Sequence, residues 1–379
     1  MTVITNGHFP GLPIVATFVG SPSGHKDATM TDLFSPITLG ALRLPNRIAM
    51  APMTRNRSPG GVPNALNAEY YAQRASAGLI ITEGTTPDPS GHGYIDIPGL
   101  YDAKTQEGWR GVARAVKEKG GHVFVQLMHT GRISHPDFLG GAQPVAPSAV
   151  QAPGQIWTHE GQKDHGTPRA LETGEVAPLA ASFGRAARLA VEAGLDGVEI
   201  HGANGYLVSQ FLASNTNRRE DEWGGSVENR VRFLLAATDA AIAAVGGGRV
   251  GVRLSPGSTF NDIHDADAEA THAHAIAELA KRPIAYLHIL DSRPGWDVAA
   301  QARRLFGGTL MLNGGFDRAR ADAAIASGAA EMVSFGAPFI ANPDLPARLR
   351  AGAPLTAPDP ATFYGGTAKG YTDYPVLAA

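Results

Sequence analysis

Short apolar runs recur along the chain and alternate with longer amphipathic stretches. Each run is almost continuously apolar and ends at a glycine, a proline or a polar group, which is typical of a strand buried on both faces. The runs span residues 48–53, 79–84, 122–129, 196–202, 249–256, 284–290, 309–315 and 331–336. Between them, Ala-rich helical patterns with acidic starts and glycine stops include residues 104–120, 178–194 and 226–246.

Eight strand–helix alternations predict an α/β fold, a single (β/α)8 TIM barrel. The alternative is a doubly wound open sheet, which typically has fewer strands. Its dinucleotide-binding form needs a GxGxxG loop after the first strand, and residues 48–58 contain none. Residues 130–177, after the third strand, are rich in glycine, proline and polar residues, so we expect a long capping loop over the barrel mouth.

The composition excludes several classes of function. With a net charge of −3 and no block of lysine or arginine, the 379-residue chain lacks the signature of a nucleic-acid surface. No apolar run reaches the length of a membrane span. The absence of cysteine excludes disulfides, thiolate metal sites and an iron–sulfur cluster, and it agrees with a cytoplasmic location. A monomer or a homodimer is compatible with these features.

The first 29 residues do not follow the pattern of the rest. Residues 11–20 are apolar, but no lysine or arginine precedes them, which argues against a signal peptide. The alternating pattern begins after Met30. Our hypothesis is that residues 1–29 are a dispensable extension, or an over-long start, that need not be ordered, and that residues 30–379 form the barrel.

Chemistry in such a barrel takes place where the strands end and the βα loops begin. These ends show no pair of carboxylates suited to glycoside hydrolysis. His201 lacks a partner at metal-ligand spacing, so we expect no metal site. Read in order, the strand ends carry Thr54, Gly84, Gln126, His201, Arg253, Asp291, Asn313 and Gly336.

His201, Asn204 and Tyr206 form a cluster at the end of the fourth strand. His201 and Asn204 are three residues apart, so in a turn that opens a helix they can point the same way. Two donors aimed at one point can hold an oxygen that gains negative charge, and the Tyr206 phenol can deliver a proton. The structural alternative is a satisfied histidine, a turn asparagine and a packed tyrosine.

Other strand ends favour an anionic heterocyclic cofactor. Arg253 can place a positive charge beside such a cofactor, or form a structural ion pair. The Gln126 amide can pair with a heterocycle edge or cap the sheet, and Thr54 can serve the ligand or cap a helix. Asn313-Gly314-Gly315 and the turn at Gly336 close the last two strands, where barrels often bind a phosphate. A tight turn is the alternative there.

Over residues 31–377 the sequence resembles the old yellow enzyme family of FMN-dependent ene-reductases, in particular the bacterial branch of N-ethylmaleimide, glycerol trinitrate and morphinone reductases. The matching segments include LFSPITLGALRLPNRIAMAPMTRNRS, VQLMHTGRISHP, HGANGYLVSQFLASNTNRREDEWGGSVENRVRF, FIANPDL and YGGTAKGYTDYP. The resemblance implies that FMN lies across the mouth and is reduced by NADPH or NADH. It further implies hydride transfer from flavin N5 to the β-carbon of an activated alkene, such as an enone, enal, maleimide or nitroalkene.

The resemblance also assigns roles to residues. His201 and Asn204 would hold the carbonyl oxygen of the alkene, and Tyr206 would protonate its α-carbon. Thr54 would contact the flavin ring, Gln126 its pyrimidine end, and Arg253 would stabilise the reduced anionic flavin. Further flavin-binding positions would be Ala51, Pro52, Met53, Gly84, His201, Asn313, Gly314, Gly315, Gly336 and Ala337, and the substrate pocket would be lined by Tyr94, Met128, Asn261 and Tyr364.

Three positions depart from the family pattern. Many members have an arginine where this chain has Ala337, so we expect weaker FMN retention here. Met128 replaces a common aromatic residue, which should change the substrate range. Gly84 replaces a more usual alanine, and we expect little effect from it.

Competing functions are a dienoyl-CoA reductase-like flavoprotein, a non-catalytic flavin-binding barrel and an enzyme directed at nitrate esters or nitro compounds. The first needs a cysteine-ligated cluster, which this sequence cannot supply.

Overall fold

A closed barrel of eight parallel strands forms the centre of the computed structural model, which describes residues 31–377. Each strand pairs with the next in sequence, and the eighth pairs with the first, which confirms the predicted (β/α)8 barrel. The strands are β3 (Ile48–Met50), β4 (Leu79–Thr85), β5 (Val123–Leu127), β10 (Gly197–Gly202), β11 (Val250–Leu254), β12 (Tyr286–Leu290), β13 (Leu310–Asn313) and β14 (Met332–Phe335). Each of the eight predicted runs coincides with one of them, except that β4 extends one residue beyond its run.

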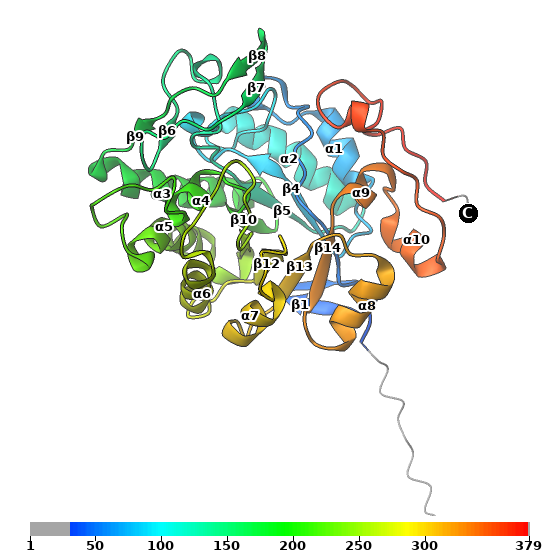
Figure 1. Ribbon diagram of the computed structural model, residues 1–379. Helices are drawn as coiled ribbons and strands as arrows, with labels where there is room; N and C mark the ends of the chain where they lie inside the picture. The colour runs from blue at the N-terminus through cyan, green and yellow to red at the C-terminus, as the bar shows by residue number, and fades with distance from the viewer. Residues whose placement is uncertain (1–30, 378–379) are drawn as a thin grey trace, which may run out of the picture. The chain divides into compact units, whose positions relative to one another are not determined.

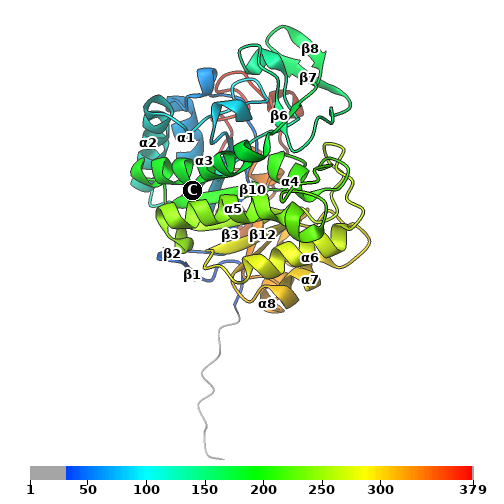
Figure 2. The same ribbon diagram turned by 90° about the vertical axis from the view of Figure 1, so that its left-hand side faces the viewer.

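Helices follow the barrel strands and surround the sheet (Figure 1). The two longest, α3 and α5, lie side by side on one flank (Figure 2). The helices are α1 (Ala65–Ala72), α2 (Ala103–Glu118), α3 (Thr173–Glu192), α4 (Leu207–Leu212), α5 (Val227–Val245), α6 (Ala268–Leu279), α7 (Val298–Leu305), α8 (Arg318–Ala326), α9 (Ala337–Ala341) and α10 (Leu345–Ala351).

The start of α3 differs from the sequence prediction. The pattern places it at Pro178, whereas the helix begins five residues earlier, at Thr173. The Glu175 side chain accepts a hydrogen bond from the backbone N–H of Glu172, and this capping interaction supports the earlier start. Pro178 therefore lies inside the helix, and the long connection after β5 is correspondingly shorter.

The two ends of the barrel are covered differently (Figures 1 and 2). At the amino end, a hairpin of β1 (Ile37–Leu39) and β2 (Leu42–Leu44) packs Leu39 and Leu44 against the apolar barrel floor. Near the opposite end, the predicted capping segment carries β6 (Val145–Ala146), β7 (Gln155–Thr158), β8 (Gly161–Asp164) and β9 (Arg169–Ala170). The β7–β8 hairpin stands above the mouth.

Side chains inside the barrel are stacked in layers, as expected when alternate residues of each strand point inward. The floor is apolar and includes Ala49, Phe124, Met311 and Met332. Toward the carboxyl ends of the strands the interior becomes polar. We call this set the polar layer, and it consists of Gln126, Glu199, Arg253, His288, Asn313 and Ser334. The polar layer thus lies directly beneath the mouth.

Residues 1–29, interpreted above as an extension, lie outside the described residues. Among the helices of residues 31–377, none combines the length and apolar character that crossing a membrane requires.

Candidate functional site

His201 is the penultimate residue of β10, at the mouth of the barrel, and its ring is almost fully buried. Its Nδ1 accepts a hydrogen bond from the backbone N–H of Ala203 at 3.3 Å, so the ring proton resides on Nε2. Burial and the nearby Arg253 guanidinium lower the pKa of His201 to about 3. His201 is therefore a neutral imidazole with one N–H free to donate.

Asn204 is held in a left-handed backbone conformation, with φ of 59°. Its backbone N–H donates to Ser255 Oγ at 2.9 Å, and its carbonyl accepts from Asn261 Nδ2 at 2.8 Å. Asparagine tolerates this conformation better than most residues. These two contacts fix the turn that follows His201, and hence the backbone position of Asn204.

Tyr206 is buried beside His201, with ring centroids 5.2 Å apart. Its hydroxyl lies 3.1 Å from the hydroxyl of Tyr94. Burial raises the pKa of Tyr206 and raises that of Tyr94 well above the usual range. Both phenols are therefore protonated at neutral pH, and together they form a short chain of proton donors.

A cavity of about 610 Å³ opens above this pair. Of the predicted residues, it is lined by Thr54, Tyr94, Tyr206, Asn261 and Tyr364. Its rim also carries three large aromatic side chains with high exposure, namely Trp157 at 65%, Phe260 at 59% and Tyr364 at 69%. They come from the β7–β8 hairpin, the loop after β11 and the carboxyl-terminal segment. Sequence reasoning missed Trp157 and Phe260.

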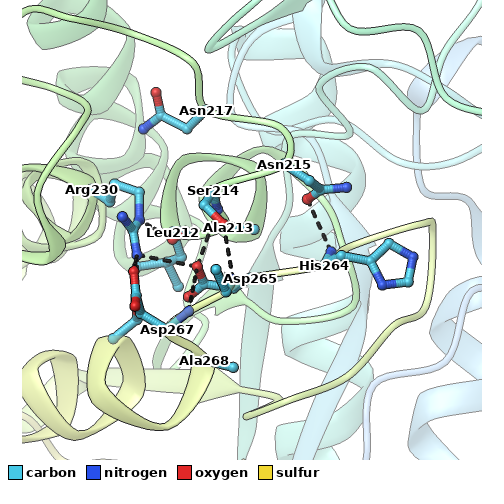
Figure 3. A network of polar contacts seen from close by, with 12 residues as sticks. Leu212, Ala213, Ser214, Asn215, Asn217, Arg230, His264, Asp265, Asp267 and Ala268 are labelled. Atoms are coloured by element: carbon cyan, nitrogen blue, oxygen red, sulfur yellow. Dashed lines mark hydrogen bonds and ion pairs between the residues drawn. The ribbon is translucent and has the colours of Figure 1, made fainter.

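The loop that carries Phe260 and Asn261 is anchored to α5 by a buried ion pair (Figure 3). Arg230 Nη2 contacts Asp265 Oδ1 at 3.1 Å and Asp267 Oδ2 at 3.2 Å. On the other side, Arg132 Nη2 donates to the carbonyl of Asn261 at 2.9 Å. These contacts fix the loop at its middle and near its carboxyl end, and so hold Asn261 against the Asn204 turn.

Three buried arginines hold the carboxyl-terminal segment that brings Tyr364 to the cavity. Arg55 donates to the carbonyls of residues 362, 363 and 370, and Arg57 donates to those of residues 362, 363, 367 and 369. Tyr371 stacks on Tyr70 with ring centroids 4.0 Å apart. We call the set Arg55, Arg57, Arg74, Tyr70 and Tyr371 the arginine clasp.

Gln126 and Arg253, predicted to face a heterocycle, both belong to the polar layer. Gln126 Nε2 donates to Glu199 at 2.8 Å, which directs the amide nitrogen downward. Arg253 Nη2 donates to Asn313 Oδ1 at 3.1 Å, while Nη1 lies against the His288 ring. Arg253 Nε is buried without a hydrogen-bond partner among residues 31–377. Both side chains are thus fixed from below.

Met128 and Gly84 form one packed unit. A Cβ atom at Gly84 would lie 2.5 Å from Met128 Sδ, far inside van der Waals contact. Met128 thus occupies the space that a methyl group at position 84 would take, but the atoms in the way belong to the end of a flexible side chain. The expectation that Gly84 has little effect stays a prediction. Met128 itself is buried in a cluster with Tyr206 rather than on the cavity surface, so it supports the wall from behind.

The predicted phosphate-binding site consists mainly of backbone from two glycine-containing turns. Gly314 and Gly315 have φ of 146° and 66°, and Gly336 precedes α9, which begins at Ala337. Ala337 is exposed. Arg320 Nη1 donates to the Gly315 carbonyl at 2.7 Å, which brings one cation to this turn. Ala51 N also donates to the Phe335 carbonyl, which joins the first strand to this end of the mouth.

The polar layer contains residues that sequence reasoning missed. Glu199, His288 and Ser334 point inward with the predicted residues, and Tyr286 reaches Glu199 from the floor. A period-two reading could have found Glu199, because it lies two residues before His201 on the same strand.

Comparison with known proteins identifies the family. The family described as NADH:flavin oxidoreductase / NADH oxidase matches residues 32–356. The chain belongs to the old yellow enzyme family. It is accordingly an oxidoreductase that uses a flavin and a nicotinamide reductant.

Two curated relatives and one solved structure illustrate the match. The chain is 41% identical to rice 12-oxophytodienoate reductase 1, over 95% of this chain and 97% of that protein. It is 42% identical to a probable flavin mononucleotide-dependent alkene reductase of Leishmania infantum, over 91% and 97%. Morphinone reductase in complex with tetrahydroNAD is 46% identical, with a TM-score of 0.88 over 92% and 98%.

The residues at the mouth of this old yellow enzyme family member fit a flavin. The unpartnered Arg253 Nε and the fixed Gln126 amide are suited to a polar ring edge that gains negative charge. The Gly314–Gly315 turn has no side chains to block an approaching phosphate group. The family pattern leads one to expect a cationic side chain at position 337, and this chain has alanine there.

Proposed function

We propose that this protein is an FMN-dependent ene-reductase that reduces activated alkenes at the expense of NADPH or NADH. Bound FMN would supply the redox chemistry, accepting hydride from the nicotinamide and passing it to the β-carbon. The observation that carries the proposal is the pairing of a neutral donor, His201, with a protonated phenol, Tyr206, which lines the cavity and whose ring lies 5.2 Å from the His201 ring.

His201 would bind the carbonyl oxygen of the alkene through its Nε2–H, since Nδ1 is already an acceptor for Ala203. Asn204 would supply the second donor from the turn fixed by Ser255 and Asn261. A neutral imidazole is suited to this task because it donates at any pH well above 3. The two donors would stabilise the oxygen as it gains negative charge.

Tyr206 would protonate the α-carbon, which completes the addition of two hydrogens across the double bond. Its phenol is protonated over the neutral range, and the Tyr94 hydroxyl at 3.1 Å offers a path for its reprotonation. A positioned general acid typically contributes 10²- to 10⁴-fold in rate.

On the flavin side, we assign the ring contacts to Thr54, Gln126 and Arg253. The backbone from Ala51 to Met53, together with Gly84, would line the ring. The phosphate would lie at Asn313–Gly315 and Gly336–Ala337, held by backbone N–H groups. The alkene reductase of Leishmania infantum supports the assignment of FMN and of the reaction class by its similarity over most of the chain.

The test separates the two half-reactions on FMN-loaded protein. Tyr206→Phe should leave flavin bleaching by NAD(P)H unchanged and slow its reoxidation by cyclohexenone by about 10²-fold or more. The matched control is Tyr374→Phe, which removes a phenol hydroxyl that lies outside this cavity and accepts from the backbone N–H of Asp359, and which should change either rate by less than about threefold. Equal reoxidation rates in Tyr206→Phe and unchanged protein would contradict the proposed role. A protein that cannot be loaded with FMN would contradict the function itself.

A further inference from the structure

Glu199 is a buried carboxylate that the proposed reaction does not use. It lies on β10 two residues before His201, so both side chains point into the barrel and Glu199 is one layer lower. Its side chain has no exposure to solvent. An ionised carboxylate in such a place is costly unless several donors stabilise it.

Three donors surround this carboxylate. Gln126 Nε2 donates to Oε1 at 2.8 Å, while the Tyr286 hydroxyl and His288 Nδ1 donate to Oε2 at 3.1 and 2.8 Å. Gly251 allows the Tyr286 contact, because a Cβ atom there would lie 2.2 Å from the phenol ring. The carboxylate of β10 is therefore held by donors from two other strands, β5 and β12.

The charge state of the polar layer follows from these contacts. Burial alone would raise the pKa of Glu199, but His288, Arg253 and Gln126 together hold it below its usual range. Burial and Arg253 lower the pKa of His288 to about 4. At neutral pH the layer thus holds one negative charge at Glu199 and one positive charge at Arg253, with the neutral His288 ring in contact with both.

Resting on the proposed function, we infer that Glu199 is a positioning residue for the flavin, which fixes the Gln126 amide and offsets the charge of Arg253. The Glu199 carboxylate then keeps the reduction potential of bound FMN lower than it would be with Arg253 but without the carboxylate. A two-electron reduction that leaves negative charge on the ring is favoured by a nearby cation and opposed by a nearby anion. The low dielectric of the closed barrel strengthens both effects.

The orientation of Gln126 follows from the same carboxylate. Because an ionised carboxylate only accepts hydrogen bonds, the group that faces Glu199 must be the amide NH₂. The amide oxygen is then available to accept from an N–H of the flavin ring. If Glu199 became neutral, the Gln126 amide could turn over, and its hydrogen bonds to the ring would change.

The test replaces Glu199 by an amide of the same shape and measures the midpoint potential of bound FMN against a reference dye. Glu199→Gln should favour the reduced flavin by about tenfold to a hundredfold, which is about 30 to 60 mV for a two-electron couple. The dissociation constant of FMN, measured by fluorescence quenching, should rise as well. Neither measurement requires the nicotinamide or an alkene, so failure of the proposed reaction would not imitate failure of this inference.

The matched control is Tyr286→Phe, which removes a neutral donor from the same carboxylate and leaves its charge in place. The midpoint potential of FMN bound to Tyr286→Phe should shift by less than a third of the shift measured in Glu199→Gln. A Glu199→Gln potential equal to or below that of the unchanged protein would overturn the inference, as would equal shifts in both variants. If Glu199→Gln does not fold, Glu199→Asp can replace it, because its side chain is one methylene shorter and moves the charge away. The midpoint potential of bound FMN should then rise by a smaller amount. If the potential of Glu199→Asp does not rise, the inference is overturned.

Discussion

The polar layer and the arginine clasp both bury charged side chains, and they do so in different ways. In the polar layer, one carboxylate and one guanidinium are connected by side chains, through His288 between Glu199 and Arg253. In the arginine clasp, three guanidinium groups donate mostly to backbone carbonyls and lie over tyrosine rings, as Arg57 does at 4.4 Å from the Tyr371 ring.

The difference reflects what each region must satisfy. Residues 362–371 form an irregular segment whose carbonyls have no sheet or helix ladder, so arginine N–H groups take the place of backbone donors. Arg74 likewise donates to the last carbonyls of α9, from Phe339 and Ile340. The polar layer instead lies beneath the place where we propose that FMN binds. The clasp should therefore determine stability, and the polar layer should determine the properties of the flavin.

The largest expected effect is on stability. Arg55→Met keeps the bulk of the side chain but removes the donors to three carbonyls and to the Tyr70 hydroxyl. Since each hydrogen bond from a charged group contributes about 1.5 to 3 kcal/mol, not additively, we expect a loss of about 3 to 5 kcal/mol in the free energy of unfolding. Urea denaturation measures this loss.

The control is Arg110→Met, because Arg110 is half exposed and pairs only on the surface. It should change the free energy of unfolding by less than about 0.5 kcal/mol. The FMN potential of Arg55→Met should equal that of the unchanged protein. A shift in potential comparable to that of Glu199→Gln would remove the distinction between the two regions.

The second prediction concerns acid. His288 and His201 are buried as neutral rings with pKa values of about 4 and 3, below the value of about 6.5 for an unfolded histidine. Between these values the unfolded chain binds a proton that the folded protein does not. Stability that is present above pH 6.5 is therefore lost as the pH falls toward 4, with a slope of up to about 1.4 kcal/mol per pH unit for each ring.

Removal of one such ring should reduce this slope. In His288→Gln, urea unfolding at several pH values between 6.5 and 4.5 should show a weaker loss of stability on acidification. Tyr70→Phe, in the arginine clasp, should keep the slope of the unchanged protein, because it removes no histidine. Equal slopes in all three proteins would mean that the polar layer does not contribute to acid sensitivity.

The smallest effect should follow from adding a cation where neither region supplies one. Ala337→Arg restores the side chain that the family pattern leads one to expect at the start of α9, and it should tighten FMN binding by about tenfold through one charge-assisted contact with the phosphate. Fluorescence quenching titrations measure the dissociation constant. Ala337→Gln, which lacks the charge, is the control, and an equal gain in both would exclude an electrostatic cause.

The barrel could be predicted from the sequence because a strand buried on both faces leaves a short, continuous apolar run. Gln126, His201 and Arg253 could be found because each lies close to the carboxyl end of such a run, as the penultimate residue of its strand. Glu199 and His288 lie inside the runs and are hidden by apolar neighbours that face outward. Only the alternation of side chains across the sheet distinguishes these inward-facing polar residues from their outward-facing apolar neighbours.

The arginine clasp could not be predicted for a different reason. Arg55 and Phe363 are 308 residues apart, and no local pattern indicates that they meet. The same holds for Trp157 and Phe260, which lie at one cavity only because the capping segment and the β11 loop converge there. The Met128–Gly84 contact could not be predicted either, because it depends on the space between two adjacent strands.

The arginine clasp joins an early and a late part of the chain, so it can form only near the end of synthesis. Arg55 leaves the ribosome early, but the carbonyls it binds belong to residues made about 300 positions later. At roughly 5 to 20 residues per second, that interval is on the order of 15 to 60 s. During this time the guanidinium groups of the clasp have only water or temporary partners, and the cavity lacks the wall that Tyr364 provides. The binding site is therefore completed only when almost the whole chain has been made.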